Sequence, residues 1–96
     1  GALKTLERYY VDKAIISCRS VHMQFGITDT SDGNARLHQA ALEHARQKYL
    51  VVDHSKLDNV SFSHTAPLTS VDGIVMDREF PEDWKKYLTE HHIRIY

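Results

Sequence analysis

Charged side chains directly follow three short apolar runs of the 96-residue sequence. Arg19 follows the first run, Asp53 and Lys56 follow the second, and Asp77 follows the third. Guanidinium and ammonium groups bind phosphate or carboxylate, whereas aspartate carboxylates accept hydrogen bonds from hydroxyl groups. We therefore expect Arg19 and Lys56 to hold an anionic group, and Asp53 and Asp77 to contact sugar hydroxyls. The alternative is that these are ordinary solvated turns, which are commonly charged.

The apolar runs, at residues 14–18, 49–52 and 71–76, predict the strands that position these side chains. They lack alternation of polar and apolar residues, which is typical of strands buried on both faces of a parallel sheet. Residues 34–48 contain no proline or glycine and predict a helix between the first two strands. Strand, helix and strand form a βαβ unit with a parallel pair and a right-handed crossover. In such sheets ligands bind beyond the carboxyl ends of the strands, where the charged residues lie.

Shorter elements are predicted for the rest of the chain. Ser31 or Asp32 is expected to cap the long helix, and Trp84 is expected to pack on the sheet. The other expectations are a helix at 3–10, loop residues at 27–33, a mostly looped segment at 57–70 with an extended stretch at 61–64, a helix from Pro81 to about Glu90, and a strand at 93–96. Together these elements predict a single α/β domain with a mostly parallel sheet and flanking helices.

Composition narrows the class of protein. The net charge of −1, from 12 basic and 13 acidic residues, argues against direct DNA binding by this chain. No apolar run approaches the roughly 20 residues of a membrane span, and no signal-peptide pattern is present. Cys18 is the single cysteine, so no internal disulfide can form, and a buried structural thiol in the cytoplasm is expected. His38 and His44 are too widely spaced for one helix face, so we expect neither a metal nor a cofactor.

Four segments carry a resemblance to a known family. They are Val11–Cys18, Phe25–Thr28, Leu50–Lys56 and Val71–Asp77, which include Asp-Lys-Ala, Gly-Ile-Thr, Val-Asp-His-Ser-Lys and Val-Asp-Gly-Ile-Val-Met-Asp. Their order and spacing resemble the C-terminal sensor domain of DeoR-type transcriptional regulators. That family consists of bacterial repressors with an N-terminal winged helix-turn-helix and a sensor domain of the ribose-phosphate isomerase and CoA-transferase-like fold.

The resemblance implies a role in sensing phosphorylated sugars. It implies that Thr28, Asp53 and Lys56 line the effector pocket. It also implies that residues 1–96 are the C-terminal portion of the sensor domain of a homo-oligomeric cytoplasmic repressor. The DNA-binding domain, which would contact the operator, is then outside this chain. The lack of an initial methionine fits a piece of a longer protein.

One departure from the family pattern follows the first strand, where Ser17, Cys18, Arg19 and Ser20 replace a glycine-containing turn. The basic side chain there is expected to change which effector fits. Type A ribose-5-phosphate isomerase resembles the same stretch of sequence, but it uses acidic residues after the first strand. Without a carboxylate at Arg19 or Ser20, proton transfer between sugar carbons lacks a base, so an enzyme is not expected, and a sugar-phosphate isomerase-like enzyme fragment is kept as the alternative. A dimerisation module that binds no small molecule is a further alternative.

Overall fold

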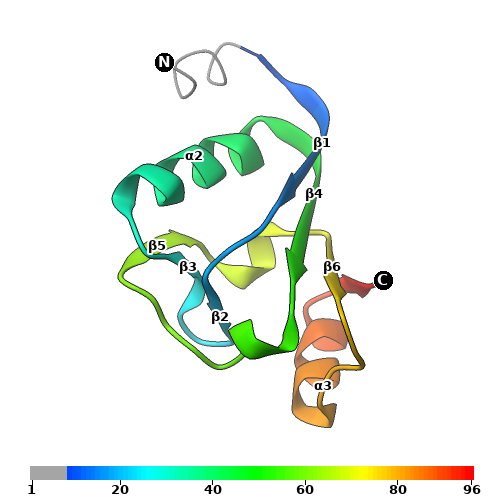
Figure 1. The fold of residues 1–96 in the computed structure, drawn as a ribbon. Helices are drawn as coiled ribbons and strands as arrows, with labels where there is room; N and C mark the ends of the chain where they lie inside the picture. Colours follow the sequence, from blue (N-terminus) through cyan, green and yellow to red (C-terminus); the bar gives the residue numbers. More distant parts are fainter. Residues whose placement is uncertain (1–8) are drawn as a thin grey trace.

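The computed structural model describes residues 9–96, which form two sheets (Figure 1). A parallel sheet has the strand order β1-β4-β6-β7, and an antiparallel sheet has the order β2-β3-β5. This arrangement confirms the predicted α/β class. The elements are β1 (Val11–Ile16), β2 (Ser20–His22), β3 (Gly26–Asp29), α2 (Asp32–Glu43), β4 (Ala45–Val52), η1 (His54–Lys56), β5 (Ser63–Ala66), η2 (Leu68–Ser70), β6 (Gly73–Met76), α3 (Glu82–Glu90) and β7 (Arg94–Ile95).

Helix α2 connects the first parallel pair, as the βαβ pattern predicts. Ser31 is its N-cap, because the Ser31 side chain accepts a hydrogen bond from the backbone N of Asn34 at 3.2 Å. The helix ends at Glu43, five residues before the predicted end. The prediction was wrong there because the backbone from Ala45 onward already pairs with β1, starting at Val11. Helix α3 lies where it was predicted.

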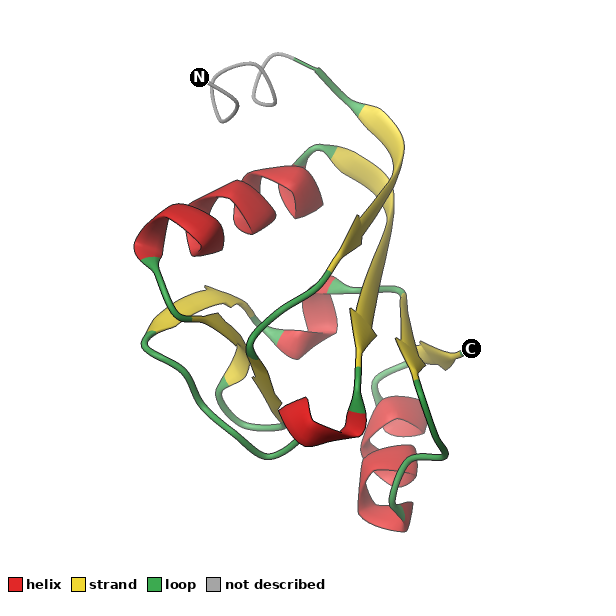
Figure 2. Ribbon diagram, viewed as in Figure 1, coloured by secondary structure: helices red, strands yellow, loops and turns green. Residues whose placement is uncertain are grey.

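One face of the parallel sheet carries the core. Ile16 of β1, Leu50 of β4 and Ile74 of β6 are buried in a single cluster with Trp84 and Leu88 of α3. Residues of α2 and of the antiparallel sheet join the same cluster, and both elements lie beside β1 and β4 (Figure 2). Trp84 is fully buried, which confirms the expectation that it packs on the sheet.

The opposite face of the parallel sheet, here called the outer face, is uncovered in the described part of the chain. Ile15 is 68% exposed and Val51 is 41% exposed, so the prediction that these strands are buried on both faces was wrong. The reason is that the core elements pack against one face alone. Tyr49 and Tyr96 meet edge to face on the outer face, at 5.8 Å between ring centroids, above Gly73. Lys13, Ile15, Tyr49, Val51, Val75 and Tyr96 line this face.

Other differences concern the antiparallel sheet. The loop predicted at 27–33 contains most of β3, whose residues are all buried. The predicted extended stretch at 61–64 is β5, shifted two residues later. The helix predicted at 3–10 lies largely outside the described residues, and residues 9 and 10 have no helical structure.

Candidate functional site

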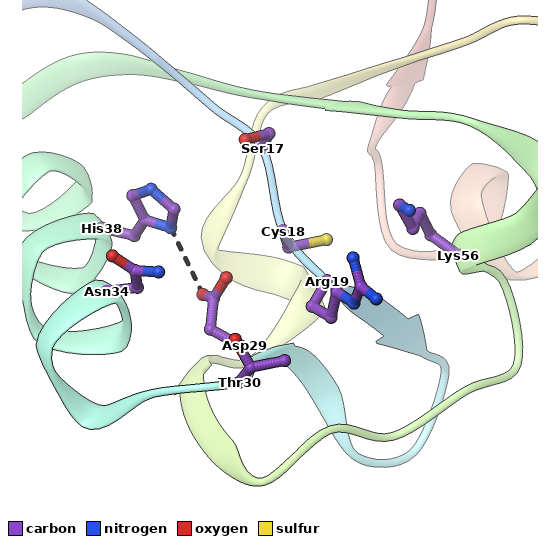
Figure 3. A pocket seen from close by; sticks show the side chains of 8 residues that line it. All are labelled: Ser17, Cys18, Arg19, Asp29, Thr30, Asn34, His38 and Lys56. Atoms are coloured by element: carbon purple, nitrogen blue, oxygen red, sulfur yellow. Dashed lines mark hydrogen bonds and ion pairs between the residues drawn. The ribbon is translucent and has the colours of Figure 1, made fainter.

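A cavity of about 490 Å³ lies at the carboxyl ends of β1, β3 and β4 (Figure 3). Its volume is within the range of small-molecule sites, and its position is the one expected for ligands in a parallel α/β sheet. The lining residues come from the segment after β1, the end of β3, helix α2 and η1: Ser17, Cys18, Arg19, Asp29, Thr30, Asn34, His38 and Lys56.

Arg19 and Lys56 form the cationic end of the cavity (Figure 3). Within residues 9–96, the Arg19 side chain has no ion pair or hydrogen bond, so it is available to a ligand. Lys56 Nζ lies 3.7 Å from a carboxylate oxygen of Asp53, a half-exposed pair that contributes little to stability. Two cations, one of them unpaired, favour an anionic ligand group at this end.

Asp53 organises the turn that carries Lys56. Its carboxylate accepts hydrogen bonds from the backbone N of Ser55, at 2.8 Å, and from the Ser55 hydroxyl. These hydrogen bonds hold the pKa of Asp53 below its usual range, so the carboxylate is charged at neutral pH. Asp53 therefore shapes the turn that carries Lys56. It lies beside the cavity, next to Lys56.

Asp29, Asn34 and His38 form the carboxylate end of the cavity (Figure 3). Asp29 is the last residue of β3 and is 5% exposed. Its Oδ2 accepts a hydrogen bond from Thr65 Oγ1 at 2.5 Å and lies 3.3 Å from His38 Nδ1. A buried carboxylate with these partners is fixed in orientation and suits recognition of a hydrogen-bond donor.

Cys18 lies between the two ends and is buried, as expected for a structural thiol. Burial, with a further contribution from the negative charge of Asp29, raises the pKa of Cys18 to about 12. At neutral pH the side chain is therefore a thiol, not the nucleophilic thiolate.

The cavity brings together two of the five residues that the sequence singled out, Arg19 and Lys56. Thr28, Asp53 and Asp77 do not line it. Thr28 is buried in β3, where its Oγ1 accepts a hydrogen bond from the backbone N of Ser61 at 2.8 Å. The Asp77 carboxylate is engaged by His54, through the backbone N at 2.8 Å and Nδ1 at 2.9 Å. The hydrogen bond from the His54 ring lowers the pKa of Asp77.

Sequence reasoning missed the carboxylate end. Asp29 falls within the loop predicted at 27–33, whereas in the structure it ends a buried strand. Asn34 and His38 stand four residues apart on α2, a spacing that places both on one face of a helix. The spacing of Asn34 and His38 was the signal available in the sequence.

Within residues 9–96, no three side chains of the metal-binding types gather closely enough to hold a metal ion. In the same residues, no helix has the length and apolarity needed to span a membrane.

Comparison with known proteins gives a consistent set of relatives. The chain is 28% identical over 88 residues to an L-fucose operon activator of Haemophilus influenzae, covering 92% of the chain and 35% of the relative. It is 32% identical over 78 residues to the transcriptional repressor GlcR of Bacillus subtilis, covering 81% of the chain and 30% of the relative. It is 25% identical over 95 residues to a glycerol-3-phosphate regulon repressor of Escherichia coli, covering 99% of the chain and 38% of the relative.

These relatives are transcriptional regulators, not enzymes, which agrees with the expectation of a non-enzymatic protein. The chain spans about a third of their length. A family model described as the DeoR C terminal sensor domain matches residues 1–78. The match covers most of the chain and confirms the resemblance found in the sequence motifs. The chain therefore belongs to the family of DeoR C-terminal sensor domains.

Proposed function

We propose that this chain is the effector-sensing part of a DeoR-type repressor and binds a phosphorylated sugar or a related metabolite. Binding shifts a cytoplasmic homo-oligomer between a form that holds operator DNA and a form that releases it. DNA contact belongs to a winged helix-turn-helix outside residues 1–96, which is consistent with the net charge of −1.

The observation that carries this proposal is the cationic end of the cavity. Arg19 and Lys56 follow different strands, β1 and β4, and border the same space at the carboxyl edge of the sheet. Arg19 is unpaired among the described residues, and a guanidinium presents a fork of donors suited to phosphate oxygens. A phosphate bound here would be a charge-assisted ligand of both side chains.

The outer face supports the further proposal that residues 1–96 are the C-terminal portion of a larger sensor domain. The six residues that line this face lie on or next to strands about 4.8 Å apart and cover on the order of 200 Å². Each partner of a stable complex buries about 800 Å², so a second copy seated on this face alone would be too weakly held. We propose that an amphipathic helix from the preceding polypeptide covers the outer face, with an acidic residue near Lys13.

Substitution of Ile15 by Lys tests this arrangement. In the natural longer protein, Ile15→Lys should lower Tm by several degrees because it places a charge under the covering helix. In the 96-residue chain the same change should leave Tm within about a degree, because Ile15 is 68% exposed. Equal effects in both proteins would contradict the covering helix. Concentration-dependent dimers of the 96-residue chain that Ile15→Lys abolishes would contradict it in favour of a second copy.

Effector binding is tested by calorimetry and thermal shift with the natural full-length protein. The probes are glucose 6-phosphate, fructose 6-phosphate, ribose 5-phosphate and inorganic phosphate. Lys56→Ala and Arg19→Ala should each weaken binding of the best probe by tenfold or more, since each removes a charge-assisted hydrogen bond. Lys86→Ala on the exposed surface of α3 is the matched control and should not change the affinity.

Two results would refute the function. One is that none of the phosphorylated probes raises Tm, although a ligand at 100 times its Kd stabilises a protein by about 2.7 kcal/mol. The other is turnover of ribose 5-phosphate, which would restore the isomerase alternative. Operator binding should persist in Lys56→Ala while its response to the effector weakens.

A further inference from the structure

The carboxylate end of the cavity has an oxygen that no described residue uses. Both contacts of Asp29, from Thr65 Oγ1 and His38 Nδ1, are made to Oδ2. Among the described residues, no fully buried side-chain oxygen or nitrogen lacks a hydrogen-bond partner. Since Oδ1 of Asp29 has no partner in residues 9–96, it must be reachable from outside, and Asp29 lines the cavity. Oδ1 therefore faces the space where a ligand would lie.

An ionised carboxylate only accepts hydrogen bonds, so it selects the chemistry of the group placed against it. A hydroxyl donates to Oδ1 and is stabilised. A second phosphate or a carboxylate at the same place would meet the like charge of Asp29 at close range, which disfavours a ligand that is charged at both ends. Asn34 and His38, on α2, offer further polar contacts beside Asp29 (Figure 3).

We propose that Asp29 is a specificity-determining residue that restricts the effector to a polyhydroxylated monophosphate. The phosphate lies between Arg19 and Lys56, and a hydroxyl at the other end of the ligand donates to Asp29 Oδ1. Sugar bisphosphates and sugar acid phosphates are rejected, because they carry negative charge at both ends. This inference rests on the proposed function and adds the class of ligand that the site accepts.

Matched ligand pairs test the inference on the natural full-length protein. One pair is glucose 6-phosphate and 6-phosphogluconate, and the other is fructose 6-phosphate and fructose 1,6-bisphosphate. The wild-type protein should bind the neutral-ended member of at least one pair tenfold or more tightly. Asp29→Asn removes the charge with little change of shape and should bring that ratio close to one.

Thr65→Val is the control for a merely structural role. Thr65 is fully buried and donates to Oδ2, so Thr65→Val removes that hydrogen bond of Asp29 while leaving Oδ1 and the charge in place. It should lower Tm but keep the wild-type ratio of affinities. Loss of the ratio in Thr65→Val to the same extent as in Asp29→Asn would overturn the inference.

The outcomes separate the two proposals. If the wild-type protein binds neither member of either pair, nor ribose 5-phosphate, the proposed function fails. If it binds both members of each pair equally, or prefers the doubly charged member, the effector function stands and the role of Asp29 is refuted. The wild-type comparison decides this even if Asp29→Asn does not fold.

Discussion

Asp58 closes the turn after Lys56 and connects three parts of the structure. Its backbone is left-handed, with φ of 63°. Its Oδ1 accepts a hydrogen bond from Trp84 Nε1 at 3.0 Å, and its backbone N donates to the carbonyl oxygen of Val21 at 2.8 Å. Substitution of Asp58 therefore separates two contributions to stability, the backbone conformation and the hydrogen bond from a buried indole.

The expected free energies of unfolding follow from these two contributions. Asp58→Asn keeps an acceptor oxygen and a residue that tolerates the left-handed region, so it should cost under about 1 kcal/mol. Asp58→Gly keeps the conformation but leaves the Trp84 N–H without its acceptor, at about 1–3 kcal/mol. Asp58→Ala loses the acceptor and adds about 1–2 kcal/mol of backbone strain. The expected order of stability is aspartate, asparagine, glycine, alanine.

Urea unfolding followed by far-ultraviolet circular dichroism measures this series. For a domain of this size, 1 kcal/mol corresponds to roughly 4–8 °C in Tm, so each step is resolvable by thermal melting as well. Asp12→Ala is a control, because Asp12 is exposed and has no hydrogen bond or ion pair from its side chain among residues 9–96. Equal stability of the glycine and alanine variants would refute the backbone argument. An asparagine variant as unstable as alanine would refute the hydrogen-bond argument.

Three other predictions concern backbone, thiol and acid behaviour. Gly26→Ala should lower the free energy of unfolding by about 2 kcal/mol or more in thermal melts, because φ is +77° and the new Cβ would lie 2.6 Å from a main-chain oxygen. Gly33→Ala in α2 meets nothing within 4 Å and should raise the free energy of unfolding by about 0.5–1 kcal/mol. Similar losses of stability in the two variants would contradict this difference. Cys18 should resist a thiol reagent at pH 8 until urea unfolds the chain, because its pKa is raised to about 12; rapid labelling of the folded protein would disprove it. The lowered pKa of Asp77, caused by His54, stabilises the fold above the ordinary aspartate pKa, and this contribution is lost as pH falls through the folded value. Asp77→Asn should therefore show a shallower loss of stability between about pH 5 and pH 2 in urea titrations, and an unchanged slope would contradict the assignment.

The parallel strands and the cationic end could be predicted from the sequence because both depend on local patterns. Continuous apolar runs indicated β1, β4 and β6, and the residues after them supplied Arg19 and Lys56. Chain direction alone brings the carboxyl ends of parallel strands to one edge. The prediction that Ile15 is buried was wrong, because an apolar run shows that a strand can be covered on both faces. Within the described residues, the core elements cover one face of the sheet alone.

The antiparallel sheet and Asp29 could not be predicted by the same means. The strands β2 and β3 have three and four residues, too few for a period to emerge from the sequence. Asp29 lies close to Ser31 and Gly33, which indicate a loop, and its burial depends on Thr65, 36 residues later in the chain. Contacts at that distance in sequence leave no local pattern.

The two cations of the cavity differ in how firmly they are held, and this difference matters for binding. The turn that carries Lys56 is fixed on several sides: Asp77 binds His54, Asp53 binds Ser55, and Asp58 binds the indole of α3. If a phosphate binds Lys56 as proposed, little further ordering of the backbone would be needed. Arg19 has an exposed, unpaired side chain, so it must lose rotamer freedom when it binds. In the proposed binding mode, Lys56 would therefore define where the anion lies, and Arg19 would close onto it afterwards.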